Sequence, residues 1–188
     1  MGYIVKVWLA TLNDGHSIVE TAFSGLWSET MMTAAASSDG PGHHGLFQCE
    51  DDPNLLAVVL GYRSRQASET VQREISDKLP RIRAWLTHKE LFLMDLNVKA
   101  LPLHTGKLAI LFADAKPEDA DSLPGKGEWA ASEPSMLTSH LPVDPSVPKK
   151  MTWVHVALAE DADRLRPLGL VQRFTMIMES RIDSHAAE

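Results

Sequence analysis

The sequence has little or nothing of several features that define whole classes of protein. It has one cysteine, Cys49, among 188 residues, so neither an internal disulfide framework nor a cysteine-rich zinc site is available. Its 18 Lys and Arg face 25 Asp and Glu, and the formal net charge of −7 argues against nucleic acid as a partner, because phosphate binding needs clustered positive charge. No apolar run approaches the ~18 residues that cross a bilayer. We therefore expect a cytoplasmic protein with no membrane and no nucleic-acid partner.

The short motifs that announce common cofactors are also missing. The sequence contains no Gly-x-Gly-x-x-Gly, no phosphate-binding loop, no Gly-x-Ser-x-Gly elbow and no His-Glu-x-x-His. We therefore predict no nucleotide, flavin or metal site, and hence no cofactor. Hydrophobic residues make up 44% and charged residues 23%, a composition typical of a globular chain that can bury a core.

The first half of the chain follows a regular order of predicted elements. Residues 3–12 are typical of a strand, and residues 17–36 have helical spacing with Ser17 as a plausible N-cap. Two further strands follow at 44–50 and 54–63, joined by an Asp-Asp-Pro-Asn turn. A helical stripe from Val71 to Leu86 is interrupted by Pro80, and residues 89–98 resemble another strand. The order β-α-β-β-α-β predicts an α+β fold with a ferredoxin-like unit over residues 1–104.

The second half, residues 105–188, is less regular. Strands are predicted at 107–115, 151–159 and 173–182, with a short helix at 161–168 that ends at Gly169. The stretch 116–150 contains more than half of the prolines, so we predict a covering loop there, with a turn or two of helix at 132–140. A weak internal echo of Arg63-Ser64-Arg65 in Glu179-Ser180-Arg181 suggests that this half is a divergent second ferredoxin-like copy.

The residues of the first half resemble a known family. They are the strand at 3–12, the hairpin from Gly45 to Tyr62 with its Asp-Pro-Asn turn, and the Arg63-Ser64-Arg65 entry to a helix. This pattern resembles the dimeric α/β barrel superfamily, in particular antibiotic-biosynthesis monooxygenase domains. Members include cofactor-free oxygenases, polyketide cyclases, haem-degrading enzymes and stress proteins. The resemblance implies two sheets that close a barrel, within a chain or in a homodimer, and a mostly apolar cavity inside the barrel or between the sheet and its helices.

Strand alternation sorts the candidate binding residues by face. Val5, Val7 and Leu9 share a face that we expect to fit under helices, opposite Lys6 and Trp8. Tyr62 at a strand end, Asn97 on the 89–98 strand and Trp153 on the 151–159 strand complete the residues expected to bind a substrate. The alternative for each is structural: Lys6 extends to solvent, and the aromatic residues belong to the core or pack at an edge.

Three residues are candidates for acid–base chemistry. His155 lies in phase with Trp153 in an apolar strand, and His44 is in phase with Leu46 and Gln48. Histidine titrates near neutral pH, so either could act as a general base. Asp95 in an apolar strand could orient a histidine or serve as a base with a raised pKa. The structural alternatives are satisfied core or surface histidines and a paired or strand-end carboxylate.

The resemblance implies a cofactor-free monooxygenase of secondary metabolism, acting on a small apolar or aromatic polyketide- or terpenoid-like substrate. A phenol or enol would lose a proton to His155 or His44, and Lys6, Tyr62 or Asn97 would stabilise the oxyanion. One alternative is a cofactor-free cyclase or isomerase in the same cavity, including pericyclic ring formation. The other is a non-catalytic small-molecule-binding or stress protein.

Overall fold

The computed structural model describes residues 2–37, 43–132 and 150–181. Its first half contains four strands and three α-helices, with short 3-10 turns between them. In chain order these are β1 (Ile4–Leu12), α1 (Thr21–Ser37), β2 (His43–Cys49), β3 (Leu55–Tyr62), α2 (Arg65–Glu74), the 3-10 turn η1 (Ser76–Lys78), α3 (Leu79–Trp85) and β4 (Leu86–Met94). Ser64 caps α2, its Oγ accepting from the Ala67 amide, and Pro80 lies in the first turn of α3, where a missing amide hydrogen costs no helical bond.

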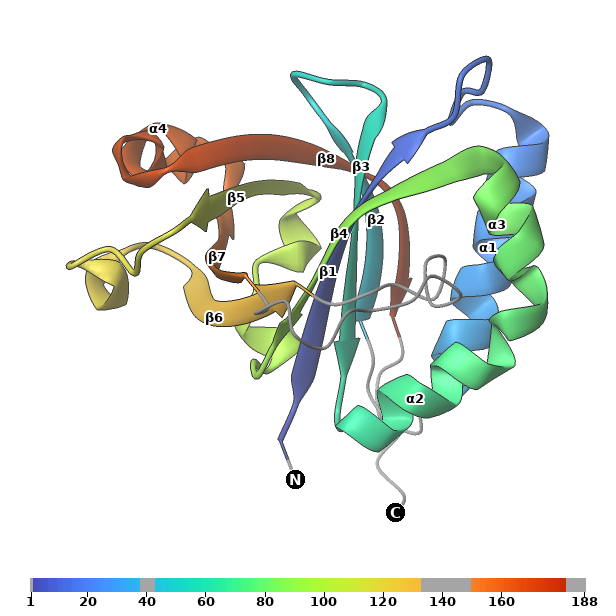
Figure 1. The fold of residues 1–188 in the computed structure, drawn as a ribbon, viewed down its shortest axis with the longest axis horizontal. Coiled ribbons are helices and arrows are strands. Elements are labelled where there is room, and N and C mark those ends of the chain that lie inside the picture. Colours follow the sequence, from blue (N-terminus) through green and yellow to red (C-terminus); the bar gives the residue numbers. More distant parts are fainter. Residues whose placement is uncertain (1, 38–42, 133–149, 182–188) are drawn as a thin grey trace.

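The second half contains four more strands and one short helix among the described residues. These are β5 (Lys107–Ala113), β6 (Lys126–Ser132), β7 (Met151–Leu158), α4 (Ala162–Leu165) and β8 (Leu170–Arg181), with the 3-10 turn η4 (Ala120–Ser122) between β5 and β6. Where the first half has long helices between its strands, this half has short helical turns (Figure 1).

The eight strands form one closed barrel within the chain. Their order is β1-β3-β2-β8-β5-β7-β6-β4, with β4 returning to β1, and all the pairings are antiparallel. The first half contributes β4-β1-β3-β2 and the second contributes β8-β5-β7-β6, so the two halves place their strands in the same relative order. Because the barrel closes inside one chain, its closure does not require a second copy.

The inside of the barrel is filled by side chains. One buried cluster takes residues from all eight strands, with Phe47, Phe92 and Phe174 among the largest, and the partly buried Phe112 packs against it. Strand alternation directs Val5, Val7 and Leu9 into this cluster, where Val5 and Val7 are fully buried. The expectation that these three residues lie under the helices was therefore wrong: the two faces of β1 were separated correctly but assigned the wrong way round.

The helices α1, α2 and α3 cover the outer surface of the first half, while α4 lies at the opposite side of the barrel (Figure 1). A second cluster packs Phe23, Leu26 and Trp27 of α1 against the outward-facing residues of the sheet, such as Leu56 and Val58. The two layers of the first half thus meet over the face that carries Lys6 and Trp8. Any space between helices and sheet has those side chains in its wall.

Several predicted boundaries are corrected by the structure. The strand expected at 89–98 runs from Leu86 to Met94, so Asp95 lies beyond its end and is exposed. The expected loop 116–150 contains strand β6, a proline-free stretch between Pro124 and Pro134 that pairs with β7. The expected helical turns at 132–140 fall, apart from Ser132 at the end of β6, outside the described residues. Helix α1 begins at Thr21 rather than Ser17, although Ser17 N does donate to Glu20 Oε1 at 2.7 Å.

Over the part of the chain that the structure describes, none of the helices has the length and apolar character needed to span a membrane.

Candidate functional site

An apolar cavity of about 90 Å³ lies between the helices and the outer face of β1, β3 and β4. Its wall includes predicted residues from two paired strands: Lys6 and Trp8 of β1 and Tyr62 of β3. The remaining wall comes from α1, α2, η1-flanking residues, α3 and the sheet, namely Trp27, Thr30, Met31, Ala34, Val58, Leu60, Val71, Gln72, Ile75, Leu79, Ile82 and Leu91. An apolar chamber with a few directed polar groups is the arrangement that small-molecule sites share.

Lys6 and Tyr62 are the titratable groups in the described wall of this cavity. The Lys6 Nζ lies 5.8 Å from the centroid of the Tyr62 ring, and both side chains are buried. Burial raises the pKa of Tyr62 above its ordinary range, because the phenolate would lose its hydration. Tyr62 therefore stays protonated and can donate a hydrogen bond, while the lysine brings a cation to the edge of an apolar space.

Two tryptophans form an aromatic wall. The rings of Trp8 and Trp27 are stacked with centroids 6.3 Å apart. Trp8 Nε1 donates to His88 Nδ1 at 3.0 Å, which fixes the indole and requires that His88 carry its proton on Nε2 when neutral. The indole nitrogen of Trp27 is buried and has no hydrogen-bond partner among the described residues. A bound oxygen atom in the cavity would be a natural acceptor for it.

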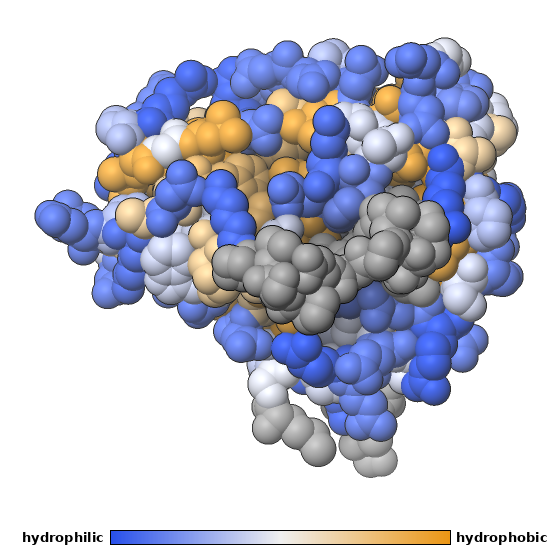
Figure 2. Space-filling view, in the orientation of Figure 1, coloured by the Kyte–Doolittle hydropathy of each residue, from blue (hydrophilic) through white to orange (hydrophobic). Residues whose placement is uncertain are grey.

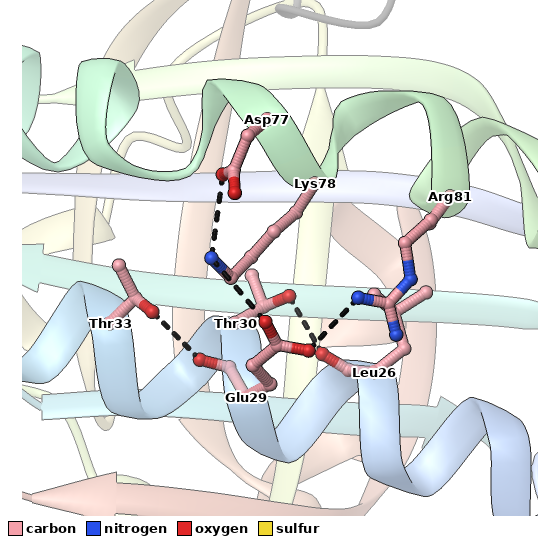
Figure 3. Close-up of polar contacts among 7 residues, drawn as sticks. All are labelled: Leu26, Glu29, Thr30, Thr33, Asp77, Lys78 and Arg81. Carbon is pink, nitrogen blue, oxygen red and sulfur yellow. Dashed lines mark hydrogen bonds and ion pairs between the residues drawn. The ribbon is translucent and has the colours of Figure 1, made fainter.

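Ion pairs hold the roof of the cavity together. Glu29 of α1 contacts Lys78 of η1 at 3.6 Å and Arg81 of α3 at 3.0 Å, and Asp77 lies 3.4 Å from the same lysine (Figure 3). The next residue on α1, Thr30, lines the cavity and donates its hydroxyl to the Leu26 carbonyl at 2.8 Å. The pairs around Glu29 therefore fix α1 against η1 and α3 directly above the cavity.

His44 lies beside the cavity without lining it. Its side chain is fully buried, and its ring centroid is 5.3 Å from that of Tyr62. Neither ring nitrogen has a hydrogen-bond partner among the described residues. Burial, with the neighbouring His43 as a smaller cause, lowers the pKa of His44 to about 4, so the ring is neutral at pH 7.

His155 and Trp153 lie in the other half of the barrel. Both are buried, and Trp153 packs in a separate cluster with Lys116 Nζ 5.2 Å from its ring and Trp129 at its edge. The Nε2 of His155 lies 2.8 Å from the Pro124 carbonyl oxygen, so this nitrogen carries the proton. Burial lowers the pKa of His155, and that hydrogen bond acts in the opposite direction. The structure does not bring these two residues to the cavity.

Asp95 and Asn97 also lie apart from the cavity. Asp95 is exposed just beyond the end of β4, which agrees with the strand-end alternative and not with a carboxylate inside an apolar strand. Asn97 caps a short 3-10 turn, its Oδ1 accepting from the Lys99 amide at 3.0 Å. The predicted residues thus divide into Lys6, Trp8 and Tyr62, which share the cavity, and five that do not.

Sequence reasoning missed the part of the site that comes from helices. Trp27, Met31 and Ala34 are spaced by four and three residues on one face of α1, a pattern that also describes an ordinary core stripe. Gln72 of α2 also lines the cavity, and it follows the buried Val71. A polar residue beside a buried one was the only sequence feature that could have indicated this position.

The two buried histidines do not fit the role of ligands to a metal or to a haem iron. His155 already uses Nε2 on Pro124, and a Cβ placed on Gly127 would come within 2.4 Å of its Nδ1, so little room remains there. His44 lines none of the cavities found around α2. In the described ranges, no group of three or more His, Cys, Asp or Glu residues is placed to hold a metal ion.

Comparison with known proteins identifies structures that share this fold. No family model matches the sequence. No curated protein matches it either. Solved structures do match: a candidate monooxygenase from Fusobacterium nucleatum has a TM-score of 0.57 at 9% identity, covering 97% of this chain and 96% of that one. A candidate monooxygenase from Lactobacillus acidophilus has a TM-score of 0.51 at 11% identity, with 98% of each chain covered.

A mutant chlorite dismutase from Candidatus Nitrospira defluvii has a TM-score of 0.51 at 13% identity, covering 94% of this chain and 92% of that one. At such low identities the likeness is one of fold. The chain has the dimeric α/β barrel fold, a mixed α and β architecture built on an eight-stranded antiparallel barrel, as its resemblance to antibiotic-biosynthesis monooxygenase domains implied.

Proposed function

We propose that this protein is a cofactor-free monooxygenase that oxidises a small, apolar, enolisable molecule of the polyketide or terpenoid kind in the cavity between the helices and the sheet. The observation that carries the proposal is the pairing of Lys6 and Tyr62 at one side of a chamber otherwise walled by apolar and aromatic side chains. The monooxygenase neighbours support it through their shared fold.

The chemistry follows from where charge develops. A methylene in conjugation with a carbonyl group ionises to an enolate, releasing its proton to solvent, and the Lys6 ammonium and the Tyr62 hydroxyl stabilise the oxygen that becomes negative. The enolate carbon then gives its electrons to dioxygen, a C–O bond forms, and the peroxide anion takes a proton back from solvent to become a hydroperoxide. Loss of water leaves a ketone, so that one CH₂ and one O₂ give one C=O and one H₂O. The apolar wall keeps water from the intermediates.

In this proposal the predicted histidines do not act as general bases. Neither His44 nor His155 lines the cavity, so Lys6 and Tyr62 act by stabilising the substrate anion. His44 then supports the ring of Tyr62 from behind, at 5.3 Å between centroids. It is a positioning residue in this scheme.

The test is oxygen consumption by the purified, metal-free protein with anthrone as an enolisable tricyclic probe. We expect Lys6→Met to lower the rate by about a hundredfold, as loss of one oxyanion donor does elsewhere. Tyr62→Phe keeps the ring and should cost less. Lys89→Met is the matched control, because Lys89 is an exposed lysine on the neighbouring strand β4.

The outcome also separates the alternatives. Turnover of the probe without oxygen uptake would replace oxygenation by a redox-neutral cyclase or isomerase reaction in the same cavity. No turnover in wild type, with binding retained, would leave a binding protein. Equal loss in Lys6→Met and Lys89→Met would contradict the assignment of Lys6.

We further propose that residues 1–104 and 105–188 are two copies of one ferredoxin-like unit. The shared relative strand order, β4-β1-β3-β2 and β8-β5-β7-β6, supports this. A homodimer remains a prediction from the family resemblance, since the barrel is complete in one chain. Light scattering of the purified protein tests it.

A further inference from the structure

A second pocket adjoins the apolar cavity at the start of α2. It measures about 140 Å³ and shares Lys6, Gln72 and Leu91 with the cavity. Its other lining residues are Ile4, Arg65, Ser68, Glu69 and Leu93. The two spaces are therefore neighbours across a common wall that includes Lys6, and the second one is lined largely by polar side chains of α2.

Ser68 gives this pocket a polar group that the protein leaves unsatisfied. The residue is 1% exposed, and its buried Oγ has no hydrogen-bond partner among the described residues. A buried hydroxyl without a partner is costly, so structures normally supply one. A ligand oxygen in the pocket would be that partner.

The position of Arg65 beside Ser68 favours an anionic ligand group. Arg65 is the first residue of α2, close to the positive end of the helix dipole, and makes no ion pair within the described ranges. The exposed Glu69 contributes one negative charge to the same lining. Arg65 and the Ser68 hydroxyl are therefore the groups that an anion would contact.

We propose that this pocket binds the carboxylate of a substrate whose apolar body occupies the adjoining cavity. The carboxylate oxygens accept from the Ser68 hydroxyl and the Arg65 guanidinium, and the substrate passes Lys6 where the two spaces meet. This inference rests on the proposed function in that both use the same cavity. It narrows the substrate class to amphipathic carboxylic acids.

Binding to the wild-type protein gives the first test. Trp8 and Trp27 line the cavity, so quenching of tryptophan fluorescence reports occupancy. We expect octanoate to bind at least ~10-fold more tightly than octanol, as suits a charge-assisted hydrogen bond. Added salt should weaken octanoate binding and leave octanol binding unchanged.

Variants then locate the effect. Arg65→Gln and Ser68→Ala should each weaken octanoate by roughly 5- to 10-fold and octanol by less than about 2-fold. Glu69→Gln should tighten octanoate by about 2-fold, because it removes a like charge. Arg73→Gln is the control: it removes the same charge from the same helix at a residue outside the pocket.

The possible failures are distinguishable. If octanol binds as tightly as octanoate, or if Arg65→Gln and Ser68→Ala weaken both equally, the carboxylate pocket is refuted while the apolar cavity stands. If neither compound quenches the fluorescence, the cavity itself and the proposed function fall together. Carboxylate preference without oxygen uptake on any probe would uphold this inference and reject oxygenation.

Discussion

The two halves of the barrel place their strands in the same order but are covered differently on the outside. The first half carries α1, α2 and α3, and a cavity remains between those helices and the sheet. Among the described residues, the second half carries the four-residue α4 and 3-10 turns, and outer side chains such as Trp153, Ala157 and Leu165 form a buried cluster there. Leu168, at the end of the 3-10 turn before β8, and Leu170, the first residue of β8, are exposed. Figure 2 shows hydrophobic side chains gathered at the upper left of the view, on the side where Figure 1 places α4. The comparison shows that this cavity belongs to the helical layer of the first half and not to the filled interior of the barrel.

The largest loss of stability should come from truncating the buried residue that attaches α4 to the barrel. Leu165 of α4 is fully buried and packs on Ala109 and Leu111 of β5, so Leu165→Ala should cost about 2–5 kcal/mol in urea unfolding. Leu79 already borders empty space, so Leu79→Ala should cost clearly less. Equal losses at the two sites would contradict the difference between the halves.

Acid should expose a second difference. His44 has a pKa of about 4 when folded and an ordinary value near 6.5 when unfolded, so between those values the unfolded chain binds the extra proton. The free energy of unfolding should therefore fall as pH drops from 6.5 to 4, by up to about 3 kcal/mol. His44→Leu should flatten this dependence.

The matched variant lies in the other half. In His155→Leu most of the acid sensitivity should remain, because the Pro124 carbonyl already offsets part of the burial effect on His155. That variant also leaves the carbonyl without its donor. Urea titrations from pH 4 to 7 measure both, and an unchanged slope in His44→Leu would disprove the prediction.

Replacing a buried alanine by leucine should destabilise the second half more than the first, because the first half has a cavity that can accept the larger side chain. Ala157 of β7 is fully buried, and even a Cβ at Gly125, which has a left-handed φ of 95°, would come within 2.9 Å of the Ala157 Cβ. Ala157→Leu should lower stability by about 1–3 kcal/mol. Ala34→Leu points into the cavity, so it should cost less stability while reducing octanoate binding. Thermal unfolding and fluorescence quenching together check the pair.

The smallest change in stability should come from the ion pairs of Glu29 that join α1 to η1 and α3. Glu29→Gln removes the charge shared by Lys78 and Arg81, and should cost about 0.5–1 kcal/mol at low salt. Asp77 still faces Lys78, which limits the loss. If high salt lowers wild-type stability no more than that of the variant, the ion pairs contribute nothing to the roof.

Much of the fold could be predicted because its signals are local. The alternation in residues 3–12, the turn at Pro53 and the break at Pro80 each act over a few residues, and they gave the element order of the first half. Strand β6 escaped because its surroundings are rich in proline, and its pairing with β7 is a tertiary effect. Local signals also cannot say which face of β1 points inward, since both faces are largely apolar.

The site was predictable in part for the same reason. Phase along β1 put Lys6 and Trp8 on one face, and Tyr62 ends the strand next to it. His44 and His155 are buried, as their positions in apolar strands predicted. The alternation of residues along a strand, however, does not distinguish a side chain that lines a cavity from one that packs in the core. The helical wall depends on how α1 lies over the sheet, which Trp27 and Met31 do not encode in their spacing.

Because the barrel is filled and the cavity lies outside it, two different sets of side chains form the core and the cavity wall. Inward residues such as Val5, Val7 and Phe174 pack in the core that joins the halves, while outward residues such as Lys6 and Trp8 line the cavity. A change in the outward set therefore alters the cavity wall without removing contacts inside the barrel. The same separation offers protein engineers a wall that can be redesigned for new chemistry.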